Sequence, residues 1–402
     1  MSTYAPLLAG LIALLAGLAI GKAWERYKLR DGRWIDRRRA RESPHYILGL
    51  NFLVSNQIDL AIEELSKAAQ LDADALEIHM ILGNLYREKG QVGRAINVHQ
   101  TLLRRPRLSR LEHAYVLLCL GLDFKRGGFV DRALEAFNEV LRLDATNQYA
   151  LVNLEKLYEE QHQWQEAHRT REQLARVTET GEQPRTQAIL SFLENELGLE
   201  AMKRQAWSEA AHRFERAIDL DPKVVPAYLN LGDVRQAEER LADAVAMWER
   251  VIAVAPERAY LTFDRLAAAY PMVGTADRFP SLCRRLIGAN PQDWRARLAL
   301  ARYLASTGSV NEGLMLLFEA LVHNPHALTI HQAIWHSLAE LDLERGLVER
   351  YVELTRHAVF YLDPHVCIRC RYRSTELLWQ CPHCHEWNTF VEERIAPAEG
   401  VG

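Results

Sequence analysis

Four cysteines near the C-terminal end form the pattern that most clearly predicts chemistry in this chain. They occur as two C-x2-C pairs, Cys367 with Cys370 and Cys381 with Cys384, separated by ten residues. Each pair can present two thiolates from one tight turn, and two such turns can surround one tetrahedral ion. Four sulfur ligands leave no position open for water or substrate. The spacing therefore predicts a structural metal site rather than a catalytic one.

Zinc is the expected ion, and iron of the rubredoxin type is the alternative, because four-sulfur sites accept both metals. Four thiolates on a divalent ion leave a net charge of about −2, which Arg369, Arg371 and Arg373 are placed to offset. Two disulfides are the competing interpretation, which a reducing cytoplasm would disfavour. The two remaining cysteines, Cys119 and Cys283, fall at core-like helical positions and are expected to be buried.

The remainder of the sequence contains no familiar catalytic motif. It has no HExxH, no G-x-S-x-G, no phosphate-binding loop and no dinucleotide fingerprint, which favours a non-enzymatic protein. The net charge of −4 argues against a nucleic-acid binder that relies on bulk basicity. Six cysteines in 402 residues are too few for a disulfide scaffold.

The elements that must position these residues follow an internal repeat. Alanines recur at intervals of 34 residues, with two longer intervals of 38 and 43 residues, and most follow a Leu-Gly pair by 12 residues. This period is typical of tetratricopeptide repeats, in which two antiparallel helices form each unit. Small residues are expected where the two helices of one repeat cross closely. The repeated alanines are Ala61, Ala95, Ala133, Ala167, Ala210 and Ala244.

Prolines are expected to close several of these units. Pro222, Pro256, Pro291 and Pro325 recur at intervals of 34 or 35 residues, and proline ends a helix. The longest interval between alanines contains residues 178–184, which we interpret as a loop. We expect about nine helix pairs in an array over residues 45–358.

Helical arrays of this kind bind partners along the face that the first helices of successive repeats form. The register places Asn84, Arg87 and Lys125 on that face, and these are the candidate partner-binding residues. Further candidates on the same face are Asp233, Gln236 and Arg302. The alternative interpretation of each is an ordinary solvated helix position.

The N-terminal segment has the character of a membrane anchor. The first 21 residues carry no charged side chain, and a helix over this stretch would reach about 26–30 Å, enough for a hydrocarbon core. Residues 22–42 contain nine Lys and Arg residues against four carboxylates. Positive charge after the apolar run places the N-terminus outside and the rest of the chain in the cytoplasm, and it favours anionic lipid. A short buried helix or an unusual signal peptide are the alternatives.

Together these patterns predict an all-α tetratricopeptide-repeat superhelix with an N-terminal transmembrane helix and a small C-terminal zinc ribbon. The expected segments are an anchor at 1–21, a basic linker at 22–44, repeats at 45–358, a four-cysteine ribbon at 359–392 and a flexible tail at 393–402.

This order of parts resembles the lipopolysaccharide assembly protein B family of Gram-negative bacteria, whose ribbon is rubredoxin-like. The resemblance covers nearly the whole chain. It is sharpest in Leu50–Gln57, Leu82–Arg87, Arg94–Leu102 and the ribbon as far as Trp387. One departure is Arg371, because such knuckles usually carry glycine after the second cysteine.

The resemblance implies a regulator of lipopolysaccharide synthesis at the bacterial inner membrane, with a periplasmic N-terminus. Such proteins work with FtsH, a membrane-anchored AAA+ protease, and promote degradation of LpxC, the deacetylase that commits precursor to lipid A. It also implies that the ribbon packs against the repeats and that both parts are needed. A general scaffold for envelope or secretion complexes is the main alternative, a nucleic-acid-binding ribbon is a weaker one, and homo-oligomers remain open.

Overall fold

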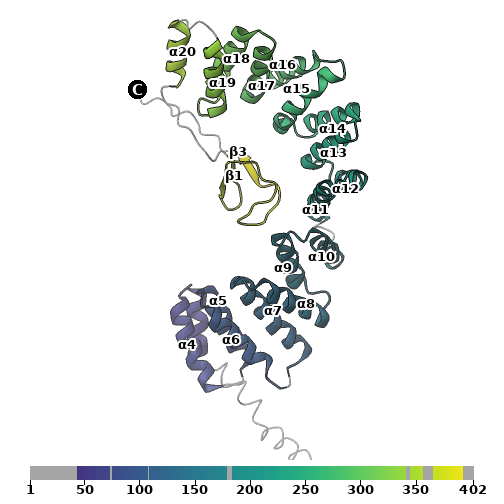
Figure 1. Ribbon diagram of the computed structural model, residues 1–402. Helices are drawn as coiled ribbons and strands as arrows, with labels where there is room; N and C mark the ends of the chain where they lie inside the picture. Colours follow the sequence, from purple (N-terminus) through teal and green to yellow (C-terminus); the bar gives the residue numbers. More distant parts are fainter. Residues whose placement is uncertain are drawn as a thin grey trace, which may run out of the picture. The chain divides into compact units, whose positions relative to one another are not determined.

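The fold is a series of antiparallel helices followed by a small sheet (Figure 1). The computed structural model describes residues 43–72, 75–106, 108–178, 183–340, 345–355 and 365–392. The chain divides into two compact units, one ending at Leu157 and the other beginning at Tyr158. Within the described ranges the chain forms eighteen α-helices, one 3-10 helix and three short strands.

The first unit contains α3 (Pro44–Val54), α4 (Ile58–Leu71), α5 (Leu76–Glu88), α6 (Val92–Leu103), α7 (Arg110–Arg126), α8 (Val130–Leu143) and most of α9 (Gln148–Glu160). The second unit continues with α10 (Trp164–Val177), α11 (Gln183–Lys203), α12 (Trp207–Leu220), α13 (Val225–Ala237), α14 (Leu241–Val254), the 3-10 helix η2 (Pro256–Thr262), α15 (Phe263–Met272), α16 (Arg278–Ala289), α17 (Trp294–Ser306), α18 (Val310–His323), α19 (Leu328–Glu340) and α20 (Arg345–Thr355).

The repeated glycines and alanines stand where paired helices cross. All six repeated alanines, from Ala61 to Ala244, have no exposed surface. Each repeated glycine faces the side chain that lies sixteen residues later on the second helix of its pair. A Cβ added to Gly121 would lie 2.6 Å from Phe137, and one added to Gly198 would lie 2.5 Å from Phe214. The period therefore records backbone contacts too close for a larger residue.

The two longer intervals between alanines are taken up largely by longer helices. Helix α7 has 17 residues and α11 has 21, whereas α5, α9 and α13 have 13. Ser109 is the N-cap of α7, and it forms a capping box with Glu112. Pro184 stands in the first turn of α11, where its missing N–H costs nothing. The interpretation of residues 178–184 as a loop is therefore wrong for its last two residues, because α11 begins at Gln183.

Prolines follow four of the second helices by two residues each. Helices α12, α14, α16 and α18 end at Leu220, Val254, Ala289 and His323. The prolines are Pro222, Pro256, Pro291 and Pro325. Each stands where the chain turns toward the next first helix, as the sequence predicts.

The C-terminal part of the second unit is a three-stranded antiparallel sheet with the strand order β2-β1-β3. Its strands are β1 (His365–Cys367), β2 (Arg373–Ser374) and β3 (Phe390–Glu392). Cys367, Cys381 and Phe390 form its small core. The predicted membrane anchor lies outside the described residues, and none of the helices described is both long and apolar enough to span a bilayer.

Candidate metal centre and partner-binding surfaces

The two C-x2-C pairs bring four sulfur atoms together at one end of the sheet. The four Sγ atoms of Cys367, Cys370, Cys381 and Cys384 all lie within 4.8 Å of one another. Across the site, Cys367 Sγ is 3.7 Å from Cys384 Sγ and Cys370 Sγ is 3.5 Å from Cys381 Sγ. Sulfurs bound to one tetrahedral zinc ion at about 2.3 Å are separated by about 3.8 Å. The cluster therefore fits a single ion.

Each pair of cysteines is held by the same turn. The N–H of Arg371 donates to the carbonyl of Cys367 at 2.9 Å, and the N–H of His385 donates to the carbonyl of Cys381 at 2.8 Å. Arg371 and His385 both adopt a left-handed backbone, with φ of 65° and 55°. Glycine adopts this conformation at no steric cost, which explains why glycine is expected after the second cysteine. Here arginine and histidine adopt it without changing the turn.

The environment of the thiols differs across the cluster. Burial opposes ionisation of Cys367, but hydrogen bonds with the Thr389 side chain and with the backbone of Cys370 and Arg369 lower its pKa to about 6. Burial, together with hydrogen bonds among the neighbouring thiols, raises the pKa of Cys384 to about 12. Four thiolates at these distances repel one another. A cation bound among them would stabilise the fully ionised set.

The ribbon is seated on the repeats of the second unit through a buried carboxylate. Glu159, at the end of α9, is 4% exposed. It accepts hydrogen bonds from Trp387 Nε1 at 3.1 Å and from Gln380 Nε2 at 2.8 Å. The Trp387 ring stacks on Phe192 of α11, with centroids 5.2 Å apart and planes inclined by 17°.

Two further contacts tie the ribbon to later helices. The guanidinium of Arg258 lies over the Trp379 ring, with Cζ 4.9 Å from the ring centroid. Arg295 on α17 pairs with Glu392 on β3 at 2.9 Å. Neither side chain of this ion pair is more than 22% exposed. These contacts make the ribbon part of the second unit and place a strand edge beside α17.

The three candidate partner-binding residues of the first unit have different surroundings. Asn84 lines a cavity of about 760 Å³ between the first helices of successive pairs, and its buried Oδ1 accepts no hydrogen bond from any residue that the structure describes. Arg87 instead donates to Asp123 Oδ1 at 2.9 Å and is 15% exposed on its side chain. Lys125 is half-buried in the last turn of α7 and interacts within the chain. The structure thus places the half-buried Asn84 beside a cavity, whereas Arg87 is paired within the chain.

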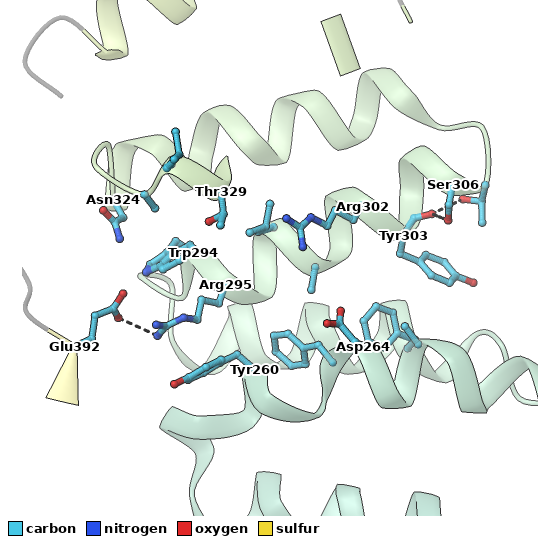
Figure 2. A pocket seen from close by; sticks show the side chains of 18 of the residues that line it. Tyr260, Asp264, Trp294, Arg295, Arg302, Tyr303, Ser306, Asn324, Thr329 and Glu392 are labelled. Carbon is cyan, nitrogen blue, oxygen red and sulfur yellow. Dashed lines mark hydrogen bonds and ion pairs between the residues drawn. The ribbon is translucent and has the colours of Figure 1, made fainter. Parts of the chain in front are cut away.

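The further candidates in the second unit also divide. The Asp233 carboxylate accepts hydrogen bonds from Arg265 at 2.7 and 2.8 Å and from Trp248 Nε1 at 3.2 Å. Its contacts are therefore within the repeats. Gln236 is exposed at the end of α13. Arg302 on α17 is exposed and lines a cavity of about 920 Å³ (Figure 2).

His99 is one of the buried polar residues that were not predicted from the sequence. His99 has no exposed surface, occupies the place that Phe137 and Phe214 take in other repeats, and lies 2.5 Å from Asp123 Oδ2. Burial would lower the pKa of His99, but hydrogen bonds with Asp123 and Cys119 outweigh it and raise the pKa to about 9. The repeat register was the available signal, since it places His99 sixteen residues after Gly83.

Fold and site together define a tetratricopeptide-repeat protein with a C-terminal four-cysteine metal ribbon. Residues 365–392 match the family model described as a rubredoxin metal binding domain. Residues 46–106 and 195–246 match the tetratricopeptide repeat model. The all-α repeat array and the rubredoxin-like ribbon expected from the sequence are thus confirmed.

Curated relatives confirm the resemblance over nearly the whole length. The chain is 27% identical over 363 residues to lipopolysaccharide assembly protein B of Escherichia coli strain K12, covering 90% of this chain and 91% of that protein. It is 24% identical over 392 residues to the protein of the same name from Haemophilus influenzae, covering 94% and 97%. Among solved structures, a tetratricopeptide-repeat protein from Cytophaga hutchinsonii matches 72% of this chain and 99% of its own, with 14% identity and a TM-score of 0.42.

Proposed function

We propose that this chain is a membrane-anchored, non-enzymatic adaptor that regulates lipopolysaccharide biosynthesis. In this function it promotes proteolysis of the lipid A pathway deacetylase, of the LpxC type, by a membrane AAA+ protease of the FtsH type. The observation that carries the proposal is the similarity to lipopolysaccharide assembly protein B over nine tenths of the chain, which includes both the repeats and the ribbon. Grooves along the first helices suit an adaptor because they offer surfaces for protein segments.

Depletion of the protein in its own cells, followed by blotting for the deacetylase, tests this function. We expect the deacetylase level to rise on depletion and to return when the wild-type chain is supplied again. The half-life of the deacetylase after translation is stopped should lengthen in parallel, because the proposed effect is on proteolysis. An unchanged level and half-life would favour the general envelope scaffold, in which case pull-downs should recover several unrelated partners.

We further propose that the four cysteines bind one Zn²⁺, with iron as the alternative. The spacing of the sulfurs supports one tetrahedral ion of either metal. Elemental analysis of the purified chain should give one metal per protein. Iron with four thiolates colours the protein, whereas zinc leaves it colourless, so the visible spectrum separates the two.

The anchor at residues 1–21 is also part of the proposal, with a periplasmic N-terminus and the repeats in the cytoplasm. The uncharged segment followed by a basic one supports this topology. An anchor would confine the adaptor to the plane of a membrane protease and raise its effective concentration there. Deletion of residues 1–21 should move the chain from the membrane fraction to the soluble fraction and slow turnover of the deacetylase. Retention in the membrane fraction would contradict the predicted anchor.

A further inference from the structure

We propose that the groove between α15, α17 and the ribbon edge binds an extended peptide that carries apolar side chains and one acidic group, with Arg302 as the partner of that acid. This inference rests on the proposed adaptor function and names the surface and the ligand chemistry through which a protein partner is held. We call this surface the C-terminal groove.

The C-terminal groove is a built cavity with an apolar floor. Its volume is about 920 Å³, near the upper end of the range of ligand pockets. Helices α15 and α17 supply most of the wall, the start of α19 supplies one end, and Thr375 and Glu392 of the ribbon close one side. Aromatic side chains dominate the floor, as Figure 2 shows for those labelled there. They are Tyr260, Phe263, Phe279, Trp294 and Tyr303.

Two of the four charged side chains that line the groove neutralise each other. Arg295 pairs with Glu392 at 2.9 Å, and its guanidinium lies over the rings of Tyr260 and Trp294, at 3.9 and 4.8 Å from their centroids. Arg302 differs, since it is exposed toward the cavity and makes no hydrogen bond or ion pair with any residue that the structure describes. A lone guanidinium beside an aromatic floor fits a ligand that is apolar apart from a carboxylate.

A second charge in the groove favours a peptide over an anionic lipid. Asp264 of α15 is exposed and lines the same cavity. Its carboxylate can accept hydrogen bonds from the N–H groups of a peptide backbone, which an anionic phospholipid does not offer. The rim also offers hydroxyl and amide groups, from Ser306, Asn324 and Thr329, that suit a chain with donors and acceptors along its length. An extended segment fits a cavity walled on one side by the ribbon better than a folded surface does.

Binding of defined peptide pools to the full chain in detergent micelles tests the inference. The first pool holds apolar peptides with a single Asp or Glu, the second holds the matched Asn or Gln peptides, and the third holds the matched Lys peptides. We expect the acidic pool to bind the wild-type chain and Arg302→Glu to weaken that binding about tenfold or more, the loss of one charge-assisted pair. The Lys pool should bind Arg302→Glu better than it binds the wild type.

Arg285→Glu is the matched control, because Arg285 is an exposed arginine on α16 that does not line the groove. Its affinity for the acidic pool should equal that of the wild type. Equal binding of the acidic and amide pools, or equal binding to wild type and Arg302→Glu, would overturn the inference. Vesicles of anionic phospholipid provide the competing ligand, and binding to them that depends on Arg302 would assign the groove to lipid instead. Self-association lost in Arg302→Glu would assign it to a second copy.

The two proposals fail in different ways. If depletion leaves the deacetylase level unchanged while the acidic pool still binds through Arg302, the deacetylase is not the protein that this adaptor regulates. Peptide binding by the C-terminal groove is then still supported. If depletion raises the deacetylase but the pools do not distinguish Arg302→Glu from the wild type, the regulatory function stands and the groove assignment falls.

Discussion

His99 is a buried imidazole at a position where three other repeats place an aromatic ring. Its pKa is raised from 6.5 to about 9, so the folded chain holds a proton that the unfolded chain releases between these two values. The resulting stabilisation is complete below about pH 6.5 and is lost as the pH rises through about 9. We therefore expect the melting temperature of the first unit to fall across this range.

The variant His99→Phe isolates this effect from other titrations. Phenylalanine faces a repeated glycine in two other repeats, and Asp123 retains Arg87 as its partner. We expect this variant to be less stable than the wild type at pH 6.5 and to lose less stability on going to pH 9. Thermal melts followed by circular dichroism at several pH values measure both slopes. Parallel slopes would show that the proton on His99 contributes nothing to stability.

Cys381 is the ligand whose loss tests the closed four-sulfur site most directly, because its side chain is fully buried. We expect Cys381→Ser to release the metal and to lower the melting temperature of the second unit, since three sulfurs no longer complete a tetrahedral site. Cys119→Ser is the control, as Cys119 lies on α7 outside the ribbon, and it should keep its full metal content. Unchanged metal content in Cys381→Ser would contradict the assignment.

At the scale of elements, the repeated glycines set how closely paired helices approach. A Cβ at Gly121 would meet Phe137 at 2.6 Å, so we expect Gly121→Ala to destabilise the first unit by about 1–3 kcal/mol. A Cβ added to Gly93, on α6, would point into open space, with no described atom outside its own stretch of helix within 4 Å. Gly93→Ala should therefore be neutral or stabilise the helix by up to about 1 kcal/mol. Urea unfolding of both variants measures the difference, and equal midpoints would contradict the close-packing argument.

The periodic small residues explain how much of the fold could be predicted from the sequence. Small residues leave a periodic mark because every repeat needs them at the same crossing, and the cysteine pairs specify their site by local spacing alone. The extension of α11 had no such mark, because the polar residues before Pro184 are as common in a loop as in a first helical turn. The contact between the ribbon and the repeats could not be predicted from the sequence either. Glu159 and Trp387 are 228 residues apart, and only the packed fold joins them.

At the scale of the whole molecule, the second unit links metal binding to its repeats. The ion would fix the ribbon, the ribbon places Trp387 and Gln380 on Glu159, and the pair of Arg295 with Glu392 fixes one wall of the C-terminal groove. A ribbon without metal would lose this geometry, and the buried carboxylate of Glu159 would then lack its two donors. Because a buried carboxylate is destabilised when it loses hydrogen bonds, loss of metal should be felt in helices that hold no ligand.

Chelation of the metal tests this coupling. In the wild type we expect a strong chelator to lower the helical melting temperature of the second unit by more than the roughly 2–4 °C that 1 kcal/mol produces in a domain of this size. In Trp387→Ala the ribbon contact is already weakened, so the chelator should change the melting temperature less. Ile368→Ala, at a ribbon residue that is 57% exposed, should behave as the wild type does. If chelation shifts all three chains equally, the ribbon and the repeats are independent, and the regulatory need for the ribbon must arise from a direct contact with a partner.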